Sequence, residues 1–250
     1  MKKIIAYSLW GDKPKYTEGA VINARQAKEI YPGWTARFYC GESVPDTILN
    51  QLREAGAEVF IVSGINDNRG MFWRFWALED GDAERILLRD TDSRLTPRER
   101  AAVAEWEHSG LVGHIMRDHP YHSMPVMGGM WGCKGNIFQD IKACIDAFSP
   151  SNAYNQDQLF LEKFIYPRLI SNGCCVHDTF FRYERNALPF PAPRKNFEFV
   201  GEAFGEDGSR DTNWHVIRDH TASPWRRFRF ACKRLVLMLR VQFRGASAKK

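Results

Sequence analysis

The sequence has few cysteines, and none of them forms the pairs that a cross-linked scaffold needs. Six cysteines are spread over 250 residues, and no two stand in a Cys-x-x-Cys arrangement. This spacing excludes the usual patterns of a disulfide framework and of a zinc cluster. We therefore expect a protein of a reducing compartment, with the cytoplasm as the default.

Long hydrophobic runs are also missing. No apolar stretch reaches the ~20 residues that a membrane-spanning helix needs, and the apolar part of the N-terminal segment is too short for a signal peptide. Internal repeats and low-complexity segments are absent as well. With 44% hydrophobic residues, a chain of this length supports one sizeable domain with its own core.

Acidic residues are absent from the C-terminal segment, residues 224–250. This segment carries nine Lys or Arg residues, which leaves 26 basic and 30 acidic residues in residues 1–223. A mildly acidic body therefore precedes a strongly basic tail. We expect a domain over residues 1–223, followed by a basic amphipathic segment over residues 224–250.

On a helical wheel, the tail separates basic from apolar side chains. The apolar group contains Phe228, Ala231, Cys232, Leu235, Met238, Leu239 and Phe243, whereas Phe230, Leu237 and Val241 break the pattern. A cationic amphipathic helix with aromatic residues suits an anionic membrane surface. The alternatives are a helix packed on the body of the protein and a helix that binds a partner.

Strand patterns and helix patterns alternate along the first half of the chain. Buried-strand patterns cover residues 3–9, 35–40, 57–62, 84–89 and 111–116, and helix patterns cover 18–31, 45–55, 70–78 and 97–108. This order predicts an α/β protein with a mostly parallel central sheet flanked by helices. In the second half, helices are expected at 136–148 and 156–165, a short strand at 174–177 and a loop over 185–213.

The triplet Asp90-Thr91-Asp92 is the most informative motif. It follows a buried-strand pattern at residues 85–88, and ligands of open α/β sheets bind at the carboxyl ends of strands. Two carboxylates suit Mn²⁺ or Mg²⁺, which commonly complete their shells with substrate phosphates. The alternative is a structural turn, because Asp bonds readily to its own backbone.

Several other residues are candidates for the same chemistry. Arg74 lies among aromatic residues and is able to grip phosphate, and Gly128-Gly129 permits either close approach to a ligand or a tight turn. Asp157 opens a predicted helix. His177, after the last predicted strand, is a candidate metal ligand or base, although an isolated histidine is more often structural.

These motifs, in this order, resemble the glycosyltransferases of the GT-A fold. The likeness is to the retaining galactosyltransferase and glycogenin-like group and to bacterial enzymes of surface-polysaccharide synthesis, and it covers residues 3–180. It implies a Rossmann-like sheet. It also implies donor-binding positions at Tyr7, Ser8, Leu9, Trp10, Gly11, Arg74, Asp90, Asp92, Gly128 and Gly129. The group's late His-Gly-Lys-Pro-Trp signature is absent.

The resemblance further implies a metal site and a set of catalytic residues. Asp90 and Asp92 would hold Mn²⁺ or Mg²⁺, with a third ligand from His177, Asp178, His215 or His220. Asp157 or Gln158 would lie beside the anomeric carbon. We also expect Asp118 as a possible base on the acceptor side. Whether the configuration of the sugar is retained or inverted stays open.

The function implied is transfer of a sugar from a nucleoside-diphosphate donor, with UDP favoured, to a saccharide or lipid-linked acceptor. Such an enzyme would work in the cytoplasm, peripherally attached to the inner face of the plasma membrane. One alternative is a phosphatase of the haloacid dehalogenase type, which wants Thr or Val where this chain has Arg94. Another is a nucleic-acid-binding protein that uses the basic tail, although the acidic body argues against that partner.

Overall fold

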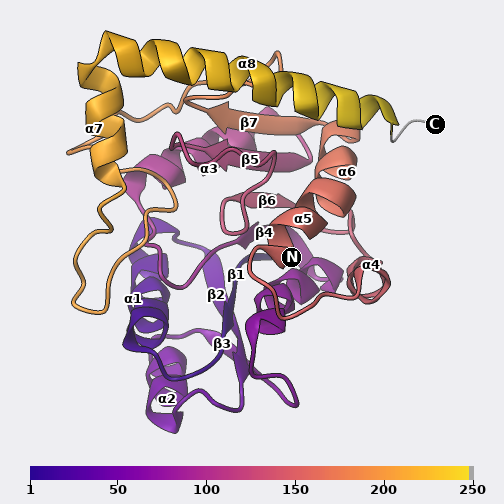
Figure 1. The fold of residues 1–250 in the computed structure, drawn as a ribbon. Helices are drawn as coiled ribbons and strands as arrows, with labels where there is room; N and C mark the ends of the chain where they lie inside the picture. The colour runs from indigo at the N-terminus through magenta and orange to yellow at the C-terminus, as the bar shows by residue number, and fades with distance from the viewer. Residues whose placement is uncertain (248–250) are drawn as a thin grey trace.

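The computed structural model describes the backbone of residues 1–247 and the side chains up to residue 241. A seven-stranded sheet forms the middle layer, with the strand order β3-β2-β1-β4-β6-β5-β7. Helices cover both faces of this sheet (Figure 1). The predicted α/β class with a mostly parallel sheet is therefore confirmed.

The strands are parallel except for one. Those of the parallel set are β1 (Lys2–Leu9), β2 (Trp34–Gly41), β3 (Glu58–Val62), β4 (Ala83–Leu88), β5 (Gly113–Arg117) and β7 (Cys174–Asp178). The exception, β6 (Trp131–Lys134), runs antiparallel between β4 and β5. Four residues that include Gly132 give a weak strand pattern, and the sequence did not predict this strand as an element.

The helices divide between the two faces of the sheet. One face is covered by α1 (Pro14–Ile30), α2 (Asp46–Glu54) and α3 (Pro97–Ser109). The other is covered by the 3₁₀ helix η1 (Asn68–Glu79), α4 (Ile141–Phe148), α5 (Gln156–Phe160), the π-helical turn η2 (Leu161–Ile165) and α6 (Tyr166–Ser171). The sequence predicted regular α-helices where η1 and η2 lie.

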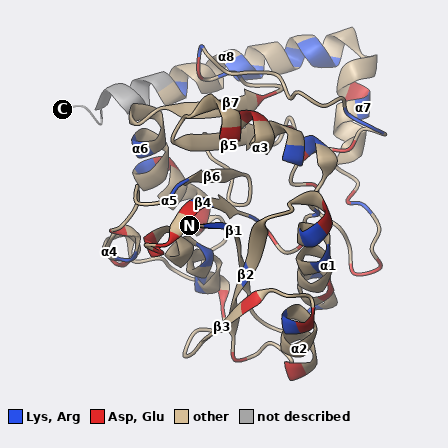
Figure 2. Ribbon diagram, turned by 180° about the vertical axis from the view of Figure 1, so that it is seen from behind, with Lys and Arg blue, Asp and Glu red and all other residues tan. Residues whose placement is uncertain are grey.

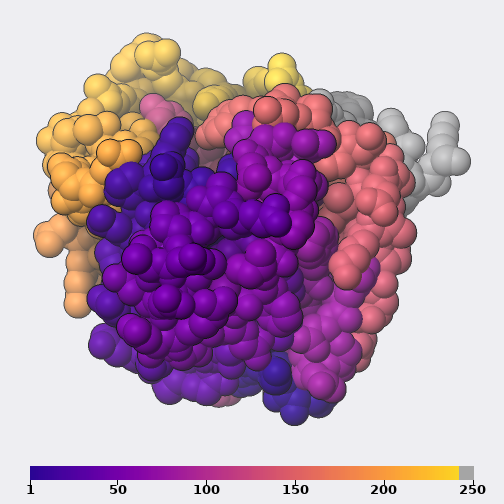
Figure 3. All heavy atoms as spheres, turned by 90° about the horizontal axis from the view of Figure 1, so that it is seen from below, coloured from indigo at the N-terminus to yellow at the C-terminus, as the bar shows by residue number. Residues whose placement is uncertain are grey.

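Side chains that alternate in direction along the strands supply a hydrophobic core on each face of the sheet. Ile4 and Ala6 of β1 pack beneath η1, whereas Ile5, Tyr7 and Leu9 pack beneath α1. Successive strand residues point to opposite faces, so a fully apolar strand feeds both layers. Seen from the end that carries β3 and α2, the surface comes mainly from the first part of the chain (Figure 3).

Two helices close the chain. A segment without helix or strand from residue 179 leads to α7 (Trp214–Ala222), and α8 (Pro224–Ser247) then lies along the β7 edge (Figure 1). Lys and Arg side chains are distributed along α8 (Figure 2). Within the part of the chain that the structure describes, no helix is long and apolar enough to span a bilayer.

Candidate active site at the carboxyl end of the sheet

The order of the strands places a crevice between β1 and β4. The chain leaves β1 for β2 on one side and later returns to β4 on the other. Such a reversal opens a crevice beyond the carboxyl ends of the two strands. A cavity of about 510 Å³ lies here, lined by residues 8–13 at the end of β1, 90–92 after β4, 127–130 before β6 and parts of 154–158.

Both carboxylates of the Asp-x-Asp triplet face this cavity. Arg74 of η1 is buried and pairs with Asp90 through one guanidinium nitrogen and with Asp157 through the other, at 2.8 Å. Lys15 of α1 lies 2.9 Å from the Asp92 carboxylate. Within this set of ion pairs, three acidic groups meet two basic groups, so the acids are in excess.

The turn that carries the triplet is fastened to α1. The buried Asn23 donates from its amide to the carbonyls of Thr91 and Ser93, at 3.2 and 2.9 Å. A Cβ atom on Gly19 would lie 2.2 Å from the Thr91 carbonyl oxygen, so only glycine permits this approach. The triplet is thus held by tertiary contacts, beyond the local bonding of an ordinary Asp turn.

The pair Gly128-Gly129 packs directly against the acidic groups. A Cβ atom on Gly129 would lie 2.1 Å from an Asp90 carboxylate oxygen, and one on Gly128 would lie 2.5 Å from Asp157. Real side chains do not tolerate such distances, so these glycines let the backbone close over the two carboxylates. Of the two alternatives for Gly128-Gly129, the structure shows close approach of the backbone, and the groups approached are carboxylates of the protein itself.

The local charges alter the acidity of the carboxyl groups. Burial raises the pKa of Asp92, and the negative charge of Asp90 raises it further, while Lys15 acts in the opposite direction. Burial also raises the pKa of Asp157, against the opposing charge of Arg74. Carboxylates that disfavour ionisation beside one another provide a place where an added cation is stabilising.

The donor set fits a hard divalent cation. Asp90 and Asp92 offer carboxylate oxygens, which Mn²⁺ and Mg²⁺ prefer, and the Asp90 side chain is 42% exposed. The cavity has room for waters or phosphate oxygens beside them. Arg74 also lines the cavity and is engaged by two carboxylates, so it orients Asp90 and Asp157, and its contact with phosphate stays a prediction.

The end of β1 supplies four of the five donor-binding residues expected there. Ser8, Leu9, Trp10 and Gly11 line the cavity, and the Ser8 hydroxyl accepts a 2.9 Å hydrogen bond from the Arg74 backbone. Tyr7 does not line it. The ring of Tyr7 points to the opposite face of β1 and stacks on Phe38 at 4.6 Å, so its expected role in donor binding is wrong.

The four candidates for a third metal ligand all lie outside the cavity. His177 is buried between His114 and Glu105. Asp178 pairs with Arg117 at 2.7 Å. His215 and His220, both in α7, contact Trp214 and Phe180, respectively. The structure therefore does not bring the expected ligand His177 to the cavity that holds Asp90 and Asp92.

The expected role of Asp118 as a base on the acceptor side is also corrected. Its carboxylate is fully buried and accepts two hydrogen bonds from Arg98, at 2.8 and 2.9 Å, one from Thr179 at 2.7 Å and one from Arg194 at 2.5 Å. These groups occupy its oxygens. Asp118 therefore fixes the β5 end and the loop after β7, and it has no free lone pair for an acceptor hydroxyl.

Asp157 and Gln158, the other expected catalytic residues, do line the cavity at the start of α5. The sequence missed further residues that line it, chiefly Tyr16, Asn66 and His122, and it missed Lys15, which reaches the Asp92 carboxylate. His122 accepts a 3.1 Å hydrogen bond from the Asp118 backbone at Nδ1. No motif marks these residues, because all four come from helices and loops packed around the strand ends.

Comparison with known proteins gives similarity of structure only. No family model matches this sequence, and no curated protein matches it. Among similar solved structures, a glycosyltransferase involved in glycosylation of the major capsid of PBCV-1 is 14% identical with a TM-score of 0.46; 73% of this chain and 83% of that chain are covered. A mannosyltransferase from Pyrobaculum calidifontis in complex with GDP-Man and Mn²⁺ is 11% identical with a TM-score of 0.44, with 98% and 75% covered.

A third similar structure is that of a synthase. The 4-diphosphocytidyl-2C-methyl-D-erythritol synthase from Anaerococcus prevotii is 11% identical with a TM-score of 0.47, covering 76% of this chain and 93% of that one. At these scores the similarities carry no argument about the reaction of this chain, which must rest on the cavity itself.

Proposed function

We propose that this protein transfers a sugar from a nucleoside-diphosphate donor to a hydroxyl acceptor. One observation carries the proposal: Asp90 and Asp92 face a cavity of about 510 Å³ beyond the switch between β1 and β4. That cavity also presents Asp157, Gln158 and the paired glycines. Its volume falls in the range of sites for small ligands and cofactors.

The chemistry requires negative charge to be neutralised on the departing group. The bond between the anomeric carbon and the phosphate oxygen breaks, and the acceptor oxygen bonds to the same carbon while its proton passes to a base or to the released diphosphate. A divalent ion on Asp90 and Asp92 would supply positive charge to the diphosphate. Lys15, 2.9 Å from Asp92, adds a cation at the same place.

The walls of the cavity suggest which part of the donor lies where. Trp10 and Tyr16 present aromatic rings near the end of β1 and Asn66 presents an amide, a set that suits a nucleobase. Asp157 and Gln158 line the same cavity, with Asp157 beside Gly128, and we place the sugar next to them. A UDP donor is favoured, and the acceptor is a saccharide or a lipid-linked saccharide.

Ligand-induced stabilisation tests the proposal. With Mn²⁺ present, UDP and UDP-sugars at about 100 times their Kd are expected to raise Tm by roughly 5–10 °C, because a ligand that binds only the folded state stabilises it by mass action. Differential scanning fluorimetry measures this shift. Lys15→Met should reduce it, and Lys142→Met, on an exposed part of α4, is the control. No shift with any nucleoside diphosphate would reject the donor class.

We also propose that α8 attaches the protein to an anionic membrane, as the basic tail suggested. Phe230, Leu237, Met238 and Val241 pack against the body. Three of these are the residues that broke the wheel pattern. Of the apolar group, Met238 packs on the body and the Phe243 side chain lies outside the described residues, whereas Phe228, Leu235 and Leu239 are left on the outer side. These three and Trp225 are 45–65% exposed. Packing on the body and binding a surface are compatible.

Charge favours lipid as the occupant of this exposed stripe. Arg226, Arg229, Lys233 and Arg240 are exposed on the same helix, which has no acidic residue. Each such charge contributes up to about 1 kcal/mol near an anionic surface, and buried aromatic groups add to it. Attachment would place the cavity at the cytoplasmic face, where a lipid-linked acceptor resides.

Vesicle sedimentation tests this attachment. The full-length protein should bind vesicles of phosphatidylglycerol and phosphatidylcholine but not phosphatidylcholine alone. Trp225→Ala with Phe228→Ala should weaken binding at least about tenfold, from lost apolar insertion. Phe60→Ala with Ile61→Ala removes similarly exposed apolar groups on β3 and should leave binding unchanged. Equal binding to neutral vesicles, or equal loss in both double variants, would contradict the proposal.

A further inference from the structure

A second cluster of ligand-type side chains lies between β5, β7 and α3, away from the active-site cavity. His114 of β5 and Cys175 and His177 of β7 are buried, and one ligand atom from each lies within 4.8 Å of the others. None of the three lines the cavity described above. This cluster has no part in the proposed transfer reaction.

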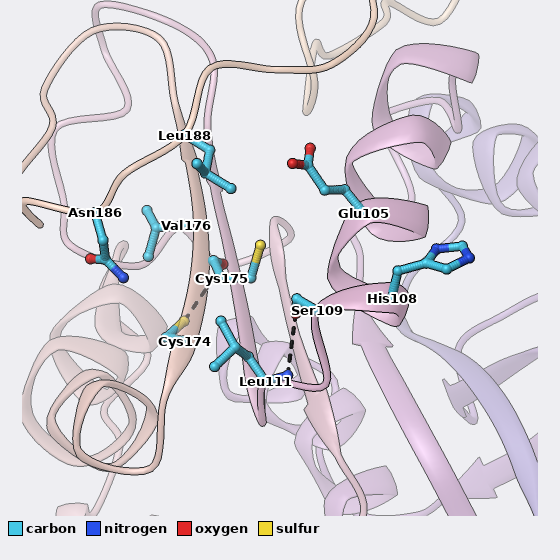
Figure 4. Close-up of a pocket in the computed structure, with 9 residues that line it drawn as sticks. All are labelled: Glu105, His108, Ser109, Leu111, Cys174, Cys175, Val176, Asn186 and Leu188. Atoms are coloured by element: carbon cyan, nitrogen blue, oxygen red, sulfur yellow. Dashed lines mark hydrogen bonds between the residues drawn. The ribbon is translucent and has the colours of Figure 1, made fainter.

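The register of the sheet produces the cluster. In the parallel pair β5–β7, His114 stands opposite Cys175 and Met116 stands opposite His177. Residues 175 and 177 are two apart and share one face, and parallel partners point the same way. Three ligand side chains therefore project together towards α3. The close view shows the Cys175 thiol directed to that side, where Glu105 lies (Figure 4).

The distances suit a small ion. His114 Nε2 lies 2.9 Å from His177 Nδ1, which lies 4.0 Å from Cys175 Sγ. Tetrahedral zinc with bonds of about 2.0–2.1 Å to nitrogen and 2.3 Å to sulfur separates such ligand pairs by about 3.4–3.6 Å. Changes of about half an ångström in these two separations would match them to such an ion, and the ion would replace the hydrogen bond between the two rings.

The surroundings of His177 support this geometry. Its Nε2 lies 3.0 Å from a carboxylate oxygen of Glu105. A proton donated from Nε2 to Glu105 leaves the Nδ1 lone pair directed at the cluster, which is the carboxylate–histidine arrangement found behind metal-bound imidazoles. Burial lowers the pKa of both histidines, which favours the neutral form of the rings that ligates a metal.

A route for entry is present. Glu105 and Cys175 line a hollow of about 330 Å³ that opens beside α3, and the Glu105 side chain is 43% exposed. A fourth ligand, such as water, therefore has access from this side. One thiol and two imidazoles form a borderline-soft donor set, unlike the carboxylates of the active site.

We propose that His114, Cys175 and His177 bind a borderline-soft divalent ion, with Zn²⁺ as the first candidate, and that Glu105 orients His177. Such an ion would tie β5 to β7 at the edge of the sheet on which α8 rests. Binding would require the Cys175 thiolate and would release its proton.

Cobalt substitution tests the site directly. The full-length protein, freed of metal by chelation and held in excess Mg²⁺ to occupy the carboxylates, is titrated with Co²⁺. One equivalent should give a thiolate-to-cobalt charge-transfer band in the near ultraviolet. Absence of that band in the unmodified protein would overturn the proposal, whatever the variants do.

Variants locate the ligands. Cys175→Ser should abolish the band. Cys174→Ser, the adjacent cysteine, whose thiol contacts the Cys175 carbonyl at 3.7 Å, should retain it. Glu105→Gln should weaken Co²⁺ binding about 10–100-fold and keep the band. A band that survives in Cys175→Ser would also overturn the assignment. His177→Gln gives a second test if Cys175→Ser does not fold, with far-ultraviolet circular dichroism as the measure of folding.

Discussion

Asp92→Asn is expected to lower the rate of sugar transfer by about 10²–10³-fold. The substitution keeps the shape of the side chain and removes its charge, and losses of this size follow the removal of one group that stabilises developing charge. The Asp92 carboxylate faces the cavity and holds Lys15 at 2.9 Å. The measurement is release of nucleoside diphosphate from the donor that stabilises the protein most, with Mn²⁺ present.

A matched control separates charge at the site from charge in general. Asp146→Asn changes an exposed carboxylate on α4 and should leave the rate unchanged. Unaltered turnover in Asp92→Asn would reject the metal-assisted mechanism. Chelation by EDTA distinguishes the two possible sources of positive charge: loss of turnover indicates the divalent ion, whereas retained turnover in EDTA that falls in Lys15→Met assigns the charge to Lys15.

The central sheet and most of its helices could be predicted from the sequence, because the patterns that indicate them are local. Fully apolar runs such as residues 3–9, bounded by turns and alternating with helix patterns, predict a parallel sheet whose strands are covered on both faces. The failures also have local causes. β6 is four residues long and holds a glycine, and η1 shares an apolar composition with an α-helix while adopting the tighter turn.

The sequence predicted site residues only where they adjoin the end of a strand. Asp90 and Asp92 follow β4 directly, so the position of the strand fixes theirs. Lys15 and Asn23 reach the triplet from α1, and only tertiary packing reveals that approach. The surroundings of His177 could not be predicted either. The register between β5 and β7 gives His177 partners that are distant in sequence, so no spacing reveals them.

Arg74→Met is expected to destabilise the folded protein by about 3 kcal/mol. The Arg74 guanidinium is 5% exposed and lies between Asp90 and Asp157, whose side chains are 42% and 11% exposed. Removal of one partner from a buried ion pair typically costs 3–5 kcal/mol, because the other charge stays buried without compensation. The exposure of Asp90 favours the lower end. Urea denaturation measures the change, and thermal unfolding should show a fall of roughly 6–12 °C.

A second substitution distinguishes loss of charge compensation from loss of packing. Asp157→Asn, placed in the Arg74→Met background, removes one of the two carboxylates that have lost their cation and should restore part of the lost stability. If the stability lost in Arg74→Met came from packing alone, the double variant would be no more stable than the single one. Arg69→Met, which removes an exposed arginine paired with Asp67 on the same helix, should leave the urea midpoint unchanged. Because Arg74 also positions Asp90, its variant should lose transfer activity under conditions in which it remains folded.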